Sequence, residues 1–178
     1  MFAKYLCEKA GLLPSHLNKL ETLGFWTAPA SKGHHLAKKG GLAVHSVNVT
    51  ERLLALTEEQ KIEWSRPESP YIVGMLHDLV KCKCYKLNAD GESYRFVQSE
   101  WPGHGVASVM IAMVELGVRL NADEAAAIIH HMGAFGLQGQ AMTEFNAAMD
   151  KWPGQIIVTH MADWMAASVG LGWQSDEA

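Results

Sequence analysis

The sequence predicts an all-α fold, a single helical domain that carries one small β-hairpin. Two observations support this class. Hydrophobic residues recur at helical spacing in a series of segments that end at glycine or proline, and only one stretch alternates as strands do. The chain has 178 residues, 48% hydrophobic and 19% charged, which suits one domain with its own core. We expect one domain over residues 1–178, with its core at about 40–170 and a helical extension and basic loop over 1–40.

The first forty residues predict two short helices followed by a loop. Residues 3–10 have a helical composition, and Gly11 ends that helix. Ser15 is a suitable cap for the second helix, which ends at Gly24. The segment 31–41, SKGHHLAKKGG, is rich in glycine and lysine, so we expect a mobile loop there.

The middle of the chain predicts two longer helices. Residues 42–56 have apolar positions at helical spacing that leave one polar side, and residues 57–70 form a polar connection. A second helix over 70–81 begins with Ser69 as its cap and Pro70 at its first position. This helix contains YIVGMLHDLV, which is apolar almost all round, so we expect it to be buried.

The remaining elements follow from turn and cap signals. The segments on either side of NADGE alternate with aromatic residues, which predicts a β-hairpin over 84–97. A helix over 104–116 stops at Gly117, and Asn121 caps the next, which runs to Met132 and ends at Gly133. Two more helices are expected, over 141–150 and 153–169.

Composition narrows the class of protein. The formal net charge is −4, which argues against a general electrostatic binder of nucleic acid. We find no apolar run that could cross a bilayer and no secretory signal at the N-terminus. Three cysteines do not suggest a disulfide framework, so we expect a reducing, cytoplasmic location.

Histidine and aspartate occur inside otherwise apolar predicted helices, and this pattern is the main indication of a functional site. An ionised aspartate within GMLHDLV or IIVTHMADWMAA is costly unless it is paired or bound to a metal. Neutral imidazole and carboxylate are the usual ligands of zinc, manganese and iron. One such histidine alone is more often a hydrogen-bonded core residue, but a series on successive buried helices predicts a metal site. The series consists of His45, His77, Asp78, His104, His130, His131, His160 and Asp163.

The ordered series resembles the HD-domain superfamily of metal-dependent phosphohydrolases, in its two-metal branch. The matching segments are GGLAVHSVNV, GMLHDLVK, PGHGVASV, AIIHHMG and THMADWMAA, which span roughly residues 40–170. Val80 stands where the family's HD-x-G-K motif commonly has glycine. The resemblance implies that one ion is held by His45, His77, Asp78 and Asp163. It implies that Asp78 bridges to a second ion held by His104 and by one or both of His130 and His131, with His131 slightly favoured.

The resemblance also implies a reaction. Two divalent ions, from Mn, Fe, Ni, Co, Zn or Mg, would hold a bridging water that attacks a phosphate ester, with a nucleotide as the expected substrate. Asp78 and Lys81 are the catalytic candidates, and Lys81 and His160 the substrate-binding ones. A solvated lysine at a helix end is an equally weighted interpretation of Lys81. Lys32, Lys38 and Lys39 could grip further phosphates, although such a cluster is more often solvated surface.

Other functions of the same residue series stay open. Some HD proteins are phosphodiesterases or 3′→5′ exoribonucleases on cyclic or oligonucleotides, and others are di-iron oxygenases. A binding module that keeps a metal for stability is a further class. We expect a small phosphorylated substrate, no membrane partner and a possible homodimer, with nucleic acid the less favoured partner.

Overall fold

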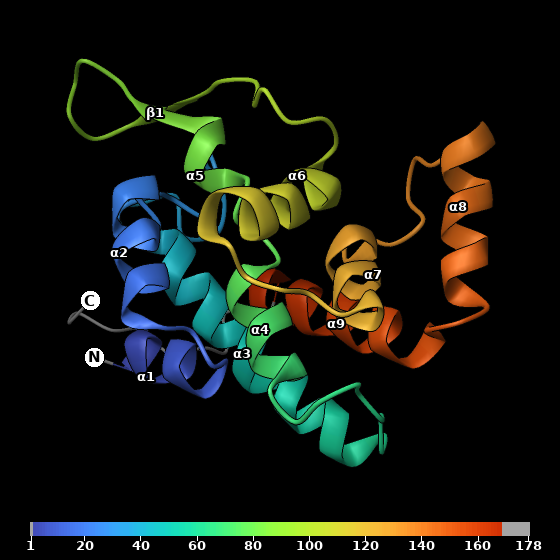
Figure 1. Ribbon diagram of the computed structural model, residues 1–178. Coiled ribbons are helices and arrows are strands. Elements are labelled where there is room, and N and C mark those ends of the chain that lie inside the picture. The colour runs from blue at the N-terminus through green and yellow to red at the C-terminus, as the bar shows by residue number, and fades with distance from the viewer. Residues whose placement is uncertain (1, 169–178) are drawn as a thin grey trace.

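Helix α3 lies at the centre of the fold, packed between α4 and α9 (Figure 1). The computed structural model describes residues 2–168. Its elements, in chain order, are α1 (Phe2–Lys9), α2 (Pro14–Leu23), α3 (Gly41–Glu59), α4 (Ser69–Leu76), α5 (Lys81–Cys84), β1 (Tyr85–Leu87), β2 (Tyr94–Phe96), α6 (His104–Met110), the π-helix η1 (Ile111–Leu116), α7 (Ala122–His130), α8 (Gly139–Met149) and α9 (Pro153–Ser168). The predicted all-α class with one antiparallel hairpin is therefore confirmed.

Two glycines let pairs of helices approach more closely than a side chain would permit. A Cβ added to Gly74 of α4 would lie 2.6 Å from the Cα of Thr50 on α3. A Cβ added to Gly105 of α6 would lie 2.3 Å from the carbonyl oxygen of Ile129 on α7. Both distances are far below ordinary contact, so the α3–α4 and α6–α7 contacts depend on the missing side chain.

The apolar side chains form two clusters around α3. The larger joins α1 and α2 to the central helices, through residues such as Leu6, Leu20, Leu42 and Met75. The smaller lies at the other end of α3 and includes Leu53, with side chains of α4, α7 and α9. The first forty residues therefore contribute to the main core. Helix α8 has no buried residue and stands away from the other helices (Figure 1).

Two boundaries differ from the prediction. The second helix begins at Pro14 and takes Leu13, not Ser15, as its cap, because proline is favourable at the first helical position. The predicted helix over 70–81 ends at Leu76, and backbone hydrogen bonds of the i→i+3 type carry the chain through the next residues into α5. Ser69 is the first helical residue there and Glu68 the cap. The Ser69 hydroxyl instead donates to Glu124 on α7, at 2.7 Å.

The other elements agree with the prediction to within a few residues. The hairpin pairs Tyr85 with Phe96 and Leu87 with Tyr94. The helix from His104 changes to π-type hydrogen bonding before it stops at Gly117. Residue 169, the expected end of the last helix, lies outside the described residues. None of the helices described over 2–168 is both long and apolar enough to span a membrane.

Candidate metal centre

Six His and Asp side chains from five parts of the chain meet in the interior. They come from α3, the turn after α4, the start of α6, the end of α7 and α9. His45, His77, Asp78 and His131 are at most 2% exposed, whereas Asp163 and His104 reach the surface with 18% and 34% of their side-chain area. The set is His45, His77, Asp78, His104, His131 and Asp163, and it could hold metal ions in two overlapping groups.

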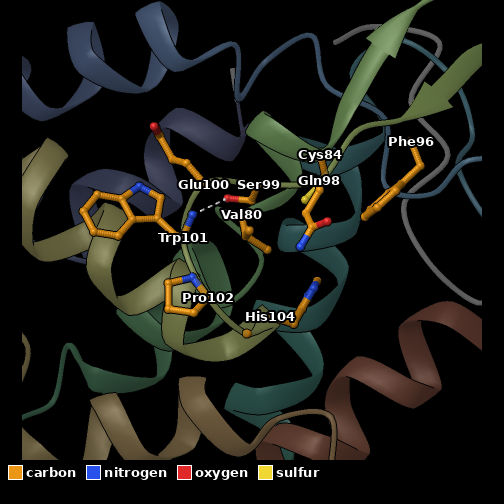
Figure 2. Close-up of a pocket in the computed structure, with 10 residues that line it drawn as sticks. Val80, Cys84, Phe96, Gln98, Ser99, Glu100, Trp101, Pro102 and His104 are labelled. Carbon is orange, nitrogen blue, oxygen red and sulfur yellow. Dashed lines mark hydrogen bonds between the residues drawn. The ribbon is translucent and has the colours of Figure 1, made fainter.

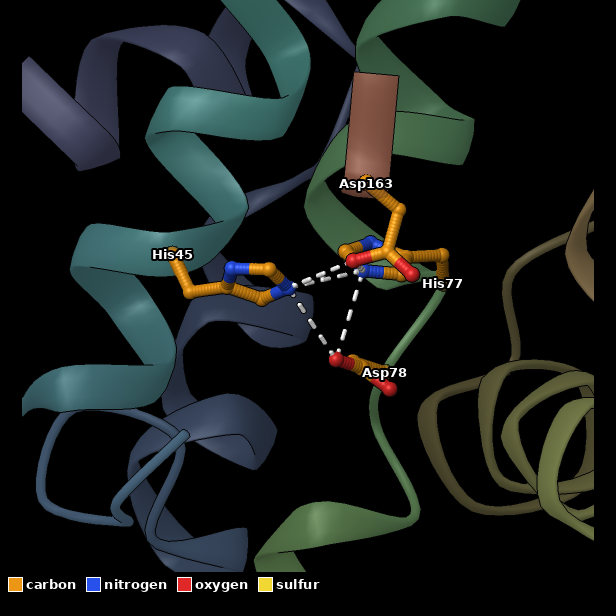
Figure 3. Close-up of side chains that lie close together, drawn as sticks. All are labelled: His45, His77, Asp78 and Asp163. Atoms are coloured by element: carbon orange, nitrogen blue, oxygen red, sulfur yellow. Dashed lines mark hydrogen bonds and ion pairs between the residues drawn. The ribbon is translucent and has the colours of Figure 1, made fainter. Parts of the chain in front are cut away.

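The first group gathers four ligand atoms around one point (Figure 3). His45 Nε2 lies 3.0 Å from Asp163 Oδ1 and 3.3 Å from Asp78 Oδ2. His77 Nε2 lies 3.4 Å from His45 Nε2 and 3.3 Å from Asp78 Oδ2. Two ligands about 2.1 Å from one ion, at tetrahedral or octahedral angles, are themselves roughly 3.0–3.4 Å apart. These four distances match the spacing of a first coordination shell, and His77 Nε2 lies somewhat farther, 3.8 Å, from Asp163 Oδ1.

The second group shares Asp78 with the first. His104 Nε2 lies 2.6 Å from Asp78 Oδ1, and His131 Nε2 lies 3.7 Å from the same oxygen. Asp78 therefore presents Oδ2 to His45 and His77, and Oδ1 to His104 and His131. One carboxylate with an oxygen in each of two histidine groups is the arrangement that a bridging ligand needs.

Backbone carbonyls fix the orientation of two of the histidines. His77 Nδ1 is 2.9 Å from the carbonyl oxygen of Gly74, and His131 Nδ1 is 2.7 Å from that of Ile128. A carbonyl can only accept, so each Nδ1 carries the proton. Each ring then directs Nε2 into the cluster, and the hydrogen bond to the carbonyl is the support that metal-binding histidines commonly have.

The charges of the site balance one another. Burial would raise the pKa of Asp78, but Lys81 and His77 outweigh burial and hold it well below its ordinary value. The pKa of Asp163 is likewise lowered, because the neighbouring His45, at 3.0 Å, and His77 outweigh burial. Burial would lower the pKa of His77, and the charge of Asp78, with the help of Asp163, instead raises it to about 10. Both carboxylates, the buried Asp78 and the partly exposed Asp163, therefore stay ionised, which is the state in which a carboxylate binds a cation.

Lys81 supplies one such cation from the protein itself. Its Nζ lies 2.6 Å from Asp78 Oδ2, and its side chain is 19% exposed. Burial would lower its pKa, but Asp78 raises it, so the ammonium stays charged. The alternative of a solvated lysine at a helix end does not hold, because Lys81 begins α5 and points into the site.

One buried atom tests whether the donor set suits a metal. Among residues 2–168, His131 Nε2 is buried without a hydrogen-bond partner, since Asp78 Oδ1 at 3.7 Å is too distant. The burial of His131 lowers its pKa, so the ring is neutral and Nε2 offers a lone pair. An unsatisfied buried acceptor is rare and calls for a physical reason. A metal ion, for which neutral imidazole is a preferred ligand, provides one.

The structure separates His130 from the candidate ligands. Its ring packs against Phe145 of α8, with 5.4 Å between the centroids, and it belongs to neither ligand group. His160 also lies outside both groups. Its Nδ1 is 2.7 Å from the carbonyl oxygen of His131, and its ring stacks on Trp164. His160 thus supports the segment that carries His131.

His35, which is not among the residues predicted from the sequence, lies next to the site. Its ring centroid lies 5.9 Å from that of His45, and its Nε2 is buried with no hydrogen-bond partner in the described part of the chain. The pKa of His35 is lowered by burial and then by His45 and Lys81. Ser31 accepts from the backbone of His34 and donates to the carbonyl of His35, which shapes the loop over α3. The only feature of the sequence that points to His35 is the pair His34–His35, with His35 ten residues before His45.

Comparisons with known proteins returned no matching family model, no matching curated protein and no matching solved structure. The geometry therefore carries the functional argument.

Proposed function

We propose that this protein is a metal-dependent phosphohydrolase of the HD type that uses two divalent ions to hydrolyse a phosphate ester, with a nucleotide as the expected substrate. One observation carries the proposal: the two oxygens of buried Asp78 face two separate groups of histidines. The order of these residues along the chain, with Asp163 last, supports it, because it resembles the series of the two-metal HD branch.

The proposed ligands divide between two ions. His45, His77 and Asp163 would hold one ion, His104 and His131 the other, and Asp78 both. Ions bound there would supply a water of lowered pKa as nucleophile and would neutralise the charge of the phosphoryl oxygens. The chain needs no nucleophilic side chain of its own for this reaction.

Lys81 has the position for a direct role. Its ammonium forms an ion pair with Asp78 and keeps its positive charge although the side chain is largely buried. A fixed positive charge beside the reacting phosphate stabilises the extra negative charge of the transition state without reorganisation of water. We assign Lys81 that role and Asp78 the role of placing the ions. His160 would act through His131, whose carbonyl it contacts.

Phosphate release tests the proposal. The wild-type protein, loaded with Mn²⁺, would be incubated with nucleoside mono-, di- and triphosphates, beside Asp78→Asn and the control Asp150→Asn; cyclic nucleotides, which open to a monophosphate without releasing phosphate, would be followed by chromatography. Asp150 is an exposed carboxylate at the end of α8, so its variant has the same charge change outside the site. We expect release by the wild type and the control, and loss of at least about a hundredfold in Asp78→Asn. No release from any substrate by the manganese-loaded wild type would contradict the proposal.

Exposed basic side chains favour a second candidate, a phosphodiesterase or 3′→5′ exoribonuclease. Lys32, Lys38 and Lys39 are exposed on the loop that precedes α3, and Lys86 and Arg95 are exposed on the hairpin. Such positive charges can contact successive phosphates along the backbone of an oligonucleotide. An oligonucleotide that contacts them should bind more weakly as salt rises, with a steep slope, whereas a mononucleotide should show a shallow one.

A further inference from the structure

A cavity opens beside the second histidine group, between the hairpin, the loop over 97–103 and the start of α6 (Figure 2). Its volume is about 370 Å³, within the range of roughly 300–1,000 Å³ typical of small-ligand sites. Phe96, Gln98, Trp101 and His104 are among the side chains that line it.

His104 connects this cavity to the metal centre. The ring lines the cavity and is 34% exposed, while its Nε2 lies 2.6 Å from Asp78 Oδ1. Val80, another lining residue, comes two positions after Asp78, and Ser108 of α6 fixes its backbone N–H. A phosphate ester bound at the ions would therefore have this cavity next to it, available to the rest of the substrate.

The walls favour a flat, uncharged group. Phe96 is 58% exposed, and Tyr85 supports it edge-on, with centroids 6.1 Å apart. The indole N–H of Trp101 is already bonded to Glu115, so that ring serves as a wall. Gln98 is exposed and its side-chain amide offers both a donor and an acceptor. An aromatic face beside an amide suits a nucleobase.

Charge argues against a second phosphate in the same place. The described lining of the cavity contains no lysine or arginine, and the charge of its one carboxylate, Glu100, is countered by Lys83 at 3.6 Å from outside the lining. The lining therefore offers an anion no cation of its own, whereas a neutral base needs none. We propose that the cavity binds the nucleobase of the substrate, with Phe96 as the stacking surface and Gln98 contacting the base edge. This inference rests on the proposed function, because it assigns the base of that function's nucleotide substrate to a particular cavity.

Two matched substrates test the inference. Adenosine 5′-monophosphate and ribose 5-phosphate share a phosphate ester and differ by the base. With Mn²⁺ present, we expect Phe96→Ala to raise KM for the nucleotide at least about fivefold and to leave ribose 5-phosphate unchanged. Phe96→Trp should keep the wild-type KM, because it preserves a stacking surface. Phe135→Ala is the control, since Phe135 is fully exposed and lies outside the cavity. An equal effect on both substrates, or none on either, would overturn the assignment.

Binding of nucleosides separates this inference from the proposed function. Saturation-transfer NMR with adenosine, guanosine, cytidine and uridine needs no phosphate chemistry. We expect contacts to base protons in the wild type, their loss in Phe96→Ala, and a changed order among the four nucleosides in Gln98→Ala. If nucleosides bind in this way but no phosphate is released from any ester, the cavity assignment stands and the phosphohydrolase proposal fails. If ribose 5-phosphate is hydrolysed but no nucleoside binds, the proposed function stands and the cavity assignment fails.

Discussion

Substitution of Gly74 by alanine should move α3 and α4 apart and weaken the metal centre. The new Cβ would lie 2.4 Å from Thr50 Oγ1 and 2.6 Å from Thr50 Cα. Ordinary contact between carbon atoms is about 3.5–4.0 Å, so the backbones must separate by roughly 1 Å. Such overpacking costs up to about 3 kcal/mol, and alanine recovers about 1 kcal/mol of helix propensity. We expect a net loss of about 2 kcal/mol, or about 4–8 °C in Tm.

The same movement should reduce metal binding. His45 belongs to α3 and His77 follows α4, and their Nε2 atoms are 3.4 Å apart. A metal site tolerates only about 0.2 Å of error in its ligand distances, so a separation of roughly 1 Å should weaken the first ion markedly. Thermal denaturation and a Mn²⁺ titration would be compared with Gly33→Ala, where no atom lies within 4 Å of the added Cβ. A Gly74→Ala protein with wild-type Tm and wild-type metal affinity would refute the close approach of the two helices.

Three further measurements test the site and the packing around it. Metal analysis after gel filtration should find that Asp78→Ala loses most bound metal and that His104→Ala loses about one equivalent. Full occupancy in the first variant would rule out a bridging role. Glu124→Gln should cost about 3 kcal/mol in urea denaturation, because this buried carboxylate accepts from Arg66 twice, at 2.7 and 2.8 Å. A cost below about 1 kcal/mol would show that the Arg66–Glu124 ion pair contributes little to the stability of the fold. Burial raises the pKa of the Cys7 thiol from 9.0 to about 12, so its contribution to stability is complete below pH 9 and falls by about 1.4 kcal/mol per unit from pH 9 towards 12. Cys7→Ala should show a shallower loss over that interval, and an identical pH profile would contradict a buried neutral thiol.

Helices and the hairpin were predictable from the sequence because local signals fix them. Glycines at 24 and 117 end their helices in the left-handed conformation, and Asn121 with Glu124 forms a cap in which Glu124 accepts from the Asn121 N–H at 2.7 Å. The early end of α4 was not predictable in this way. The segment after Leu76 contains no glycine or proline before Cys84, and its backbone is fixed by distant partners such as Ser108 on α6.

The closeness of the ligands also depends on tertiary contacts. Each of the six side chains is among the candidates predicted from the sequence, but the position of Asp78 between two groups is not, because that position depends on α3, α6, α7 and α9 together. His35 was missed for the same reason. It belongs to the glycine-rich loop, and only the fold of that loop over α3 brings it beside His45.

The choice between His130 and His131 follows from the helical phase of burial that the fold gives α7, which the alanine-rich sequence of that helix does not show. On α7 the fully buried positions Glu124, Ala127 and Ile128 recur at spacings of three and four, and the next position on that face is His131. Adjacent residues point about 100° apart, so a helix that buries His131 must direct His130 elsewhere. His130 accordingly packs against Phe145 of α8. Amphipathic phase therefore separates the inward-facing histidine from its neighbour, even where a resemblance to a family leaves the pair undecided.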